Sequence, residues 1–174
     1  MDLEQKKYPI GRFQKPVEFD EGKIKGWITV IKEFPEKVKE LTQNMSDEQL
    51  DTPYRENGWT VRQVVHHCAD SHINSFTRFK LALTEDKPVI KPYMENLWAE
   101  LEDTKHLAID SSLSILEGLH HRWTVLLESM TTEDYHRIFV HPEHNNEITL
   151  YTALATYDWH CNHHLGHIQL TLQK

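Results

Sequence analysis

Near its end the sequence carries the stretch Trp159-His160-Cys161-Asn162-His163-His164-Leu165-Gly166-His167, which places four histidines within eight residues. The segment around it, from Leu150 to about Gln173, has the character of one long helix that Thr149 would cap. At about 100° per residue, His160, His164 and His167 share one stripe of that helix, with His163 at its margin. Two histidines four residues apart can bind one metal ion, so the stretch predicts a helix and part of a metal site.

Three further segments show the apolar periodicity of long amphipathic helices. They extend over about 22–43, 61–83 and 111–130. Thr60 and Gln63 form a capping box before the second segment, and Asp110 is the expected N-cap of the third. Four long helices with long connections predict an all-α fold, a four-helix bundle, formed by residues 1–174 as a single domain.

The segments outside the long helices are expected to be smaller features. Proline and glycine in residues 1–20 predict an ordered N-terminal arm laid over the body rather than a helix. Residues 96–102 are expected to form a short helix, and residues 136–148 a small hairpin or irregular excursion before the last helix. Pro35 lies inside the first long helix, where it is expected to cause a kink.

Composition excludes several classes of protein. A formal net charge of −8 argues against a nucleic-acid partner, because phosphate binding needs a basic face. No run of about 18 apolar residues exists, so we expect no membrane span, and the N-terminus lacks the apolar core of a signal peptide. Two cysteines are too few for a disulfide framework. We therefore expect a soluble, cytoplasmic protein.

The second helix offers two candidates for the third metal ligand, His66 and His67. The helical stripe of His67 also carries Asp70, Ser71 and Arg78. An inward stripe this polar is costly unless it surrounds something that needs polar groups, so His67 is preferred. On geometry alone, His163 and His167 remain rivals of His160 and His164.

The number of ligands and the residues near them constrain the kind of site. Three neutral imidazoles leave one or two open positions on an ion, as in catalytic sites. Cys68 and Cys161 each follow a proposed ligand directly, so each points about 100° away from it and is expected to fill apolar space between helices. Gly166 costs about 1 kcal/mol relative to alanine inside a helix, which indicates close approach by another backbone.

Three stretches resemble the YfiT-like branch of the DinB superfamily: Tyr8–Gly11, Asp51–His67 and Trp159–His167. The resemblance extends nearly from end to end, and the central stretch is its most specific part. It implies a homodimeric four-helix bundle and a metal-dependent hydrolase whose zinc or nickel is held by three histidines. In the family pattern, one ligand lies eight residues after the tryptophan before the second helix, and the other two form an HxxxH pair. These positions fall on His67, His160 and His164.

The chain departs from the family pattern in two places. It ends soon after the last helix, where relatives often continue for a few residues, and it has histidine at position 167, where another residue is common. The expected cofactor is one divalent metal ion per chain, zinc or nickel, which would activate a bound water or thiol for attack on a small electrophile.

Hydrolysis and thiol transfer are both open from the sequence. No carboxylate lies within the HxxxH segment; Asp70, one turn after His67, is the candidate base, or else a residue that orients a ligand imidazole. Related thiol-dependent enzymes imply a second reading, a bacillithiol S-transferase. Because bacillithiol carries carboxylates, basic residues would line its pocket, and the candidates are Arg55, Arg62, Arg78 and Arg122. A third reading is a non-catalytic bundle whose metal is closed by a fourth ligand, His163 or His167.

Overall fold

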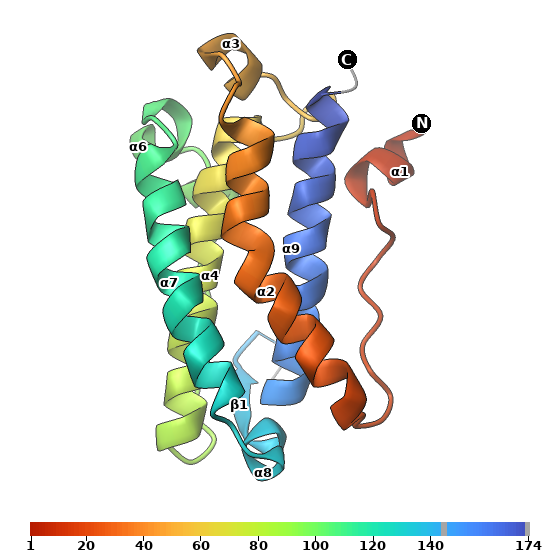
Figure 1. Cartoon of the computed structure of the whole chain (residues 1–174), viewed down its shortest axis with the longest axis vertical. Coiled ribbons are helices and arrows are strands. Elements are labelled where there is room, and N and C mark those ends of the chain that lie inside the picture. Colours follow the sequence, from red (N-terminus) through yellow and green to blue (C-terminus); the bar gives the residue numbers. More distant parts are fainter. Residues whose placement is uncertain (144–145, 173–174) are drawn as a thin grey trace.

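The computed structural model describes residues 1–143 and 146–172. Four long helices lie side by side in Figure 1: α2 (Glu21–Thr42), α4 (Val61–Thr84), α7 (Asp110–Glu128) and α9 (Leu150–Leu172). Both α2 and α4 pack mainly against α7 and α9, so α2 and α4 occupy opposite corners of the bundle. The all-α four-helix bundle expected from the sequence is confirmed.

The starts of the long helices follow local capping chemistry, with one exception. Thr60 and Gln63 form the expected capping box at α4, and Thr149 Oγ1 accepts a hydrogen bond of 3.1 Å from Thr152 N at α9. The prediction that Asp110 caps α7 is wrong, because the helix begins at Asp110 and its N-cap, Ile109, makes no side-chain capping bond. Asp110 instead lies in the first turn, where its charge is favourable with the helix dipole. The expected end of the last helix, Gln173, lies outside the described residues.

The inward faces of the four helices form one apolar cluster. Its largest fully buried members include Phe34 from α2, Phe79 from α4, Trp123 from α7 and Leu154 from α9. Each follows its helix's apolar stripe, so burial of these stripes is the main stabilising contribution to the bundle. Across residues 1–143 and 146–172, none of the helices combines the length and apolarity needed to cross a membrane.

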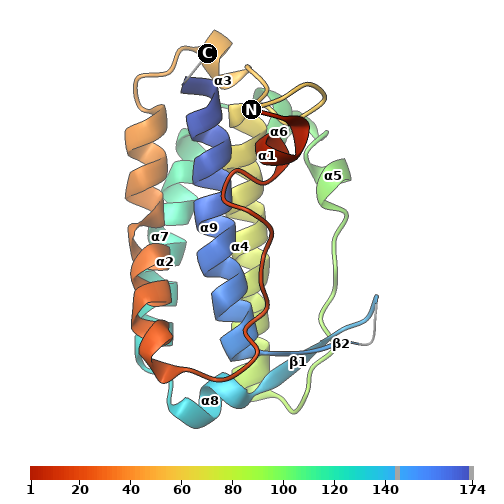
Figure 2. The same ribbon diagram turned by 90° about the vertical axis from the view of Figure 1, so that its right-hand side faces the viewer.

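Short helices occupy the connections. They are α3 (Asp47–Leu50), α5 (Glu95–Trp98), α6 (Glu102–His106) and α8 (Thr132–His136). The single short helix expected over 96–102 is therefore two helices, which meet that range only at its two ends. In Figure 2, α5 stands at the side of the bundle next to α4. This position brings the start of α5 to the histidine-rich part of the molecule.

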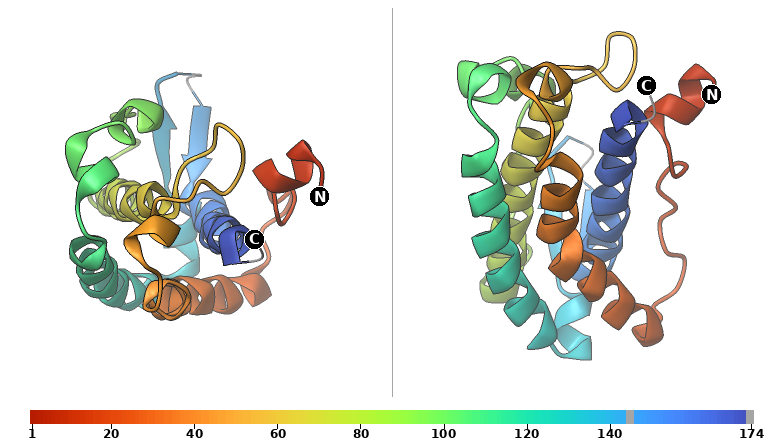
Figure 3. Two further views of the ribbon diagram at one scale, coloured as in Figure 1. Left: turned by 90° about the horizontal axis from the view of Figure 1, so that it is seen from above. Right: turned by 45° about the horizontal axis from the view of Figure 1, so that its top comes forward.

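A small antiparallel hairpin precedes α9. Of the two alternatives predicted for this segment, a hairpin or an irregular excursion, the structure shows the hairpin. Its strands are β1 (Ile138–His141) and β2 (Asn146–Thr149), with Phe139 opposite Ile148. The chain at 88–90 also joins β1, because Ile90 N donates to Val140 O at 3.0 Å and Val140 N donates to Pro88 O at 2.9 Å. Seen from above in Figure 3, the strands extend away from the helices. Asn145, counted in the expected excursion, lies outside the described residues.

The N-terminal arm covers α9 but contains a helix that its proline content concealed. Asp2 and Gln5 form a capping box at α1 (Leu3–Lys7). The arm then runs along the bundle, as Figure 2 shows. Two hydrogen bonds hold it there: Trp159 Nε1 donates to Gly11 O at 3.0 Å, and Asp20 N donates to the Tyr151 hydroxyl at 2.9 Å. The arm lies over the body of the bundle, as predicted. The prediction that the arm contains no helix is wrong, because α1 lies within it.

Candidate metal centre

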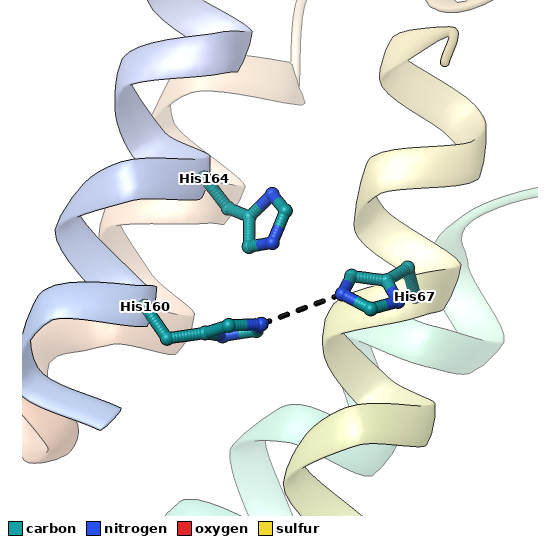
Figure 4. A group of neighbouring side chains, drawn as sticks. All are labelled: His67, His160 and His164. Carbon is teal, nitrogen blue, oxygen red and sulfur yellow. Dashed lines mark hydrogen bonds between the residues drawn. The ribbon is translucent and has the colours of Figure 1, made fainter. Parts of the chain in front are cut away.

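Three imidazoles meet between α4 and α9, as Figure 4 shows. His67 comes from the second turn of α4, and His160 and His164 come from successive turns of α9. Each offers one ring nitrogen, and these three nitrogens all lie within 4.8 Å of one another. His67 and His164 are buried and His160 is half-buried. The structure thus brings together the three residues selected from the sequence.

The spacing of the nitrogens suits a small divalent ion. His67 Nε2 and His160 Nε2 are 3.4 Å apart. Two ligands of a tetrahedral zinc, each about 2.0–2.1 Å from the ion, have nitrogens about 3.3 Å apart. The observed separation of 3.4 Å is close to this value, so the positions of the two nitrogens also suit binding to one ion. Three imidazole donors suit zinc or nickel.

Burial keeps the three imidazoles in the form that binds metal. It lowers the pKa of His67 to about 4, and it lowers the pKa values of His160 and His164 well below their usual range. The neighbouring histidines act in the same direction, because a second positive charge nearby is unfavourable. All three are therefore neutral at pH 7, with a lone pair available for an ion.

The rival histidines have other partners. His66 accepts a hydrogen bond from Ser112 Oγ at 2.7 Å through Nδ1 and donates to Leu107 O at 3.1 Å through Nε2, so both nitrogens are occupied. The His163 ring stacks on Trp159 at 4.3 Å. Its Nδ1 is buried and finds no hydrogen-bond partner in the described parts of the chain. Neither side chain belongs to the cluster of three.

The three histidines line a cavity of about 520 Å³, here called the histidine cavity. Aromatic rings pack against its wall. The ring centroids of Trp59 and His67 are 4.7 Å apart, and the Tyr54 ring stacks on the His167 ring with centroids 3.9 Å apart. Among the described residues that line this cavity, Glu95 is the one carboxylate. Desolvation by the surrounding protein raises the pKa of the Glu95 carboxyl. No sequence pattern indicates Glu95, because its position depends on the path of the long connection between α4 and α7.

A second cavity of about 610 Å³, here called the side cavity, adjoins the first. The two cavities share Glu95, Asn96 and His160 as lining residues. The side cavity also contains Arg78 of α4 and Tyr157 of α9, so it combines a cation with aromatic surface. Space for a substrate therefore extends from the histidines along α4.

Asp70 lies apart from both cavities. Burial, with a smaller contribution from Asp103, raises the pKa of the Asp70 carboxyl to about 6. Its side chain makes no hydrogen bond to His67, His160 or His164 within the described chain, and it is not among the lining residues of either cavity. Its role as a base or as an orienting residue stays a prediction.

Two further histidines, missed in the sequence, stand behind the cluster. His72 of α4 is 0% exposed and His120 of α7 is 1% exposed. His72 Nε2 lies 3.0 Å from His160 Nδ1, and His72 Nδ1 lies 2.7 Å from His120 Nε2. Their helical phase could have indicated their burial. His72 lies on the apolar stripe of α4 with Phe79, and His120 lies on the apolar stripe of α7 with Trp123.

The remaining predictions near the proposed ligands concern Gly166 of α9, Cys161 of α9 and Cys68 of α4. A Cβ added to Gly166 would lie 2.7 Å from Pro9 Cγ, so the glycine permits close approach by the ring of Pro9 rather than by a backbone. Cys68 and Cys161 are fully buried free thiols within the apolar cluster, and burial raises their pKa values. Their expected role as apolar filling is consistent with this placement.

Comparison with known proteins places the chain in a family. The model of the DinB superfamily matches residues 31–168. The Bacillus subtilis protein named "Putative metal-dependent hydrolase YfiT" is 50% identical over 161 residues, which cover 92% of this chain and 90% of that protein. A Bacillus licheniformis relative, also named as a putative metal-dependent hydrolase, is 48% identical over 167 residues, covering 96% and 95%.

A solved structure agrees over almost the whole chain. It is described as "YfiT from Bacillus subtilis is a probable metal-dependent hydrolase with an unusual four-helix bundle topology". The TM-score is 0.94 at 47% identity, with 97% of each chain covered. This chain belongs to the DinB superfamily, as its resemblance to the YfiT-like branch predicted.

Proposed function

We propose that this DinB superfamily member is a metal-dependent enzyme that holds one divalent ion, zinc or nickel, through His67, His160 and His164. The observation that carries the proposal is the approach of three neutral imidazole nitrogens to within 4.8 Å of one another beside an open cavity. Three protein ligands leave at least one position free, which is the arrangement of catalytic rather than structural zinc sites. The names of the close relatives support the same class.

Hydrolysis of a small electrophile is the leading activity. A bound divalent ion supplies Lewis acidity, lowering the pKa of water to about 7 and polarising a carbonyl oxygen. Glu95 is the carboxylate placed to accept a proton, because it lines the histidine cavity and the side cavity alike. Its raised pKa makes it a better proton acceptor than an ordinary surface glutamate. Asn96 beside it offers an amide to orient a substrate carbonyl or carboxylate.

Thiol transfer is a second candidate, favoured by the position of Arg78. Within the described chain, Arg78 is half-buried in the side cavity and makes no hydrogen bond or ion pair. It follows His67 by eleven residues, which corresponds to about 16 Å along α4, and helical side chains lean back toward the N-terminus. A cation at that distance would suit a carboxylate of a low-molecular-weight thiol such as bacillithiol whose sulfur lies at the histidines.

The other three arginines have different surroundings. Arg62 is buried in ion pairs with Asp47 at 2.8 Å and Asp51 at 2.7 Å, so it has a structural role. Arg122 lies 5.5 Å from the ring of Phe76 on the outside of α7, away from both cavities. Arg55 lines the histidine cavity and contacts the ring of Tyr54 at 5.3 Å. Of the four candidate arginines, Arg78 and Arg55 are therefore the two available to an acidic substrate.

The experiment is reconstitution of protein purified without a His-tag, first with zinc and then with nickel. Metal content, hydrolysis of chromogenic esters and amides, and conjugation of bacillithiol to a chromogenic electrophile are measured on each form. We expect one ion per chain and metal-dependent turnover in the hydrolysis assay. His160→Ala should lose the ion, whereas His121→Ala, which removes an exposed histidine of α7, should retain it. An unchanged metal content in His160→Ala would contradict the site.

The two activities are separated by a pair of arginine variants. If thiol transfer is the activity, Arg78→Gln should raise the KM for bacillithiol and leave that for a neutral electrophile unchanged, and Arg122→Gln should change neither. Conjugation without hydrolysis would establish the transferase. A protein with one bound ion that is inactive in both assays would point to the non-catalytic metal-binding reading.

A further inference from the structure

A chain of hydrogen bonds leads from the proposed metal ligand His160 through the centre of the bundle. His160 Nδ1 contacts His72 Nε2 at 3.0 Å, and His72 Nδ1 contacts His120 Nε2 at 2.7 Å. His120 Nδ1 then contacts the main-chain oxygen of Ile31 at 2.6 Å. The chain takes one residue from each of the long helices α9, α4, α7 and α2.

The direction of every hydrogen bond in this chain follows from its last member. A carbonyl oxygen can only accept, so His120 Nδ1 carries a hydrogen and donates to Ile31 O. In a neutral imidazole the other nitrogen then accepts, so His72 Nδ1–H donates to His120 Nε2. By the same rule, His160 Nδ1–H donates to His72 Nε2. His160 Nε2 is left without a hydrogen, and this is the atom that lies 3.4 Å from His67 Nε2.

Pro35 explains why a helical carbonyl is free to end this chain. In an α-helix the carbonyl of residue 31 normally accepts from the N–H of residue 35, but proline has no N–H. In a regular helix the ring of proline also clashes with the carbonyl of the residue four positions before it, which here is Ile31. The orphaned oxygen would be costly if left buried without a partner, and His120 supplies the missing donor. The proline within α2 therefore has a chemical consequence at the metal centre.

A shorter chain stands behind the second α9 ligand. His167 Nε2 lies 3.2 Å from the main-chain oxygen of Lys7, the last residue of α1. Because that oxygen can only accept, His167 Nε2 donates and His167 Nδ1 accepts. His164 Nδ1 lies 3.4 Å from His167 Nδ1 and is therefore the donor, which leaves His164 Nε2 bare. Helix ends leave such carbonyls without an intrahelical partner, so this chain too begins at an orphan acceptor.

We propose that two relays of neutral histidines, each ending on a main-chain carbonyl without a helical donor, fix the tautomers of His160 and His164 so that both present a bare Nε2 to the metal. The inner relay is His72, His120 and Ile31 O; the outer relay is His167 and Lys7 O. These histidines are positioning residues, and the inference rests on the proposed metal centre. His167, a rival ligand by sequence, thereby acts behind His164 rather than on the ion.

Neutral relays suit this site because it lies inside an apolar core. Ligand histidines are commonly oriented by a carboxylate, but an ionised carboxylate beside Phe34 and Trp123 would have to be desolvated at high cost. Imidazole provides a donor and an acceptor on opposite sides of one ring and carries no charge. Phe34 stacks on the His120 ring with centroids 5.5 Å apart, which restricts the orientation of that ring.

The first test uses two substitutions at His120, which contacts neither the ion nor a ligand. Glutamine offers an NH2 donor group and a carbonyl acceptor on the two arms of one amide, so His120→Gln can preserve the direction of the relay, whereas His120→Leu removes it. We expect His120→Leu to weaken zinc binding by about 10- to 100-fold and His120→Gln to stay close to native. Equal zinc affinity in the leucine variant and the native protein, with both folded, would overturn the inner relay.

The second test reads the tautomers directly and does not need a variant to fold. Nitrogen NMR of the zinc-free native protein should show His160 and His164 protonated at Nδ1 and bare at Nε2. The opposite tautomer at either residue would overturn its relay. If the native protein bound no metal, the proposed function would fail while this spectrum still decided the relays, so the two failures are distinguishable.

A third variant tests the origin of the free carbonyl. Pro35→Ala restores an N–H that competes for Ile31 O, and we expect a smaller loss of zinc affinity together with mixed tautomers of His160. The matched control is Gly26→Ala in the same helix, where an added Cβ meets nothing within 4 Å. Both variants should stabilise α2, but only the proline variant should change the spectrum of His160. Identical spectra in the two would overturn the role of Pro35.

Discussion

The two relays differ in where they end. The inner relay crosses the core, with His72 and His120 almost fully buried, and its hydrogen bonds are 2.6–3.0 Å long. The outer relay has one histidine, its contacts are 3.2 and 3.4 Å, and it ends on α1, a five-residue helix with no buried residue. The same chemistry is thus anchored once in the buried core and once on an arm at the surface. His160 should be the fixed ligand and His164 the adjustable one.

Acid should destabilise both relays at once, and this is the largest effect that we expect. Burial lowers the pKa values of eight histidines: His66, His67, His72, His120, His160, His163, His164 and His167. In the folded protein these imidazoles stay neutral at pH values where the same histidines of the unfolded chain bind protons. The stability of the zinc-free protein should therefore be unaffected by these groups above about pH 6.5 and fall as pH drops from 6.5 toward 4.

Carboxyl groups with raised pKa values oppose this trend only in part. Asp70, Glu95 and Asp158 bind protons more readily in the folded state, which offsets up to three of the eight protons taken up by the unfolded chain. Denaturant unfolding followed by circular dichroism between pH 7 and 4.5 measures the balance. A free energy of unfolding that did not change over this range would contradict the neutral, buried state of the histidines.

Removal of the inner relay should give the next largest effect. His72→Leu leaves His160 Nδ1–H and His120 Nε2 without hydrogen-bond partners in the core. Each buried polar group left unsatisfied in this way lowers the free energy of unfolding by about 1–3 kcal/mol. Zinc affinity should fall by about 10- to 100-fold because His160 loses its orientation. Competition with a chromogenic chelator measures the affinity. Native affinity in a folded His72→Leu protein would remove the basis for calling His160 the fixed ligand.

The outer relay should be more easily disturbed but with less effect. In Gly166→Ala the new methyl group would lie 2.7 Å from Pro9 Cγ, so the Pro9 ring must shift, and we expect the arm and Lys7 O to shift with it. We expect zinc binding to weaken by about tenfold or less. Gly118→Ala on α7 is the control, because an added Cβ there meets nothing within 4 Å. A loss larger than that of His72→Leu would reverse the comparison between the two relays.

The sequence predicted the helices and the cluster because both depend on local periodicity. The apolar stripes, the capping box at Thr60 and the HxxxH spacing are each contained within one segment, and the choice of His67 over His66 followed from helical phase. Asp110 was misplaced by one position at a helix start, where side-chain capping was absent and gave no signal. The helix α1 was missed because the prolines that follow it outweighed the Asp2–Gln5 capping box.

The parts of the site that were not predicted depend on contacts between segments far apart in the chain. Glu95 reaches the histidine cavity only through the path of the connection between α4 and α7. His72 and His120 lie on apolar stripes, where a single histidine is usually an ordinary core residue. Their proposed role depends on the folded bundle, which connects them to His160 at one end and to the carbonyl that Pro35 leaves free at the other. No pattern within one helix contains that alignment.

The X-ray absorption spectrum of the zinc-loaded protein, compared with that of His160→Ala, tests the metal centre most directly. We predict three imidazole nitrogens at about 2.0–2.1 Å with one or two oxygen ligands that exchange with solvent, and loss of zinc in the variant. A fourth imidazole, from His163 or His167, with no exchangeable oxygen would instead describe a closed, structural site. A shell unaffected by the loss of His160 would contradict the account.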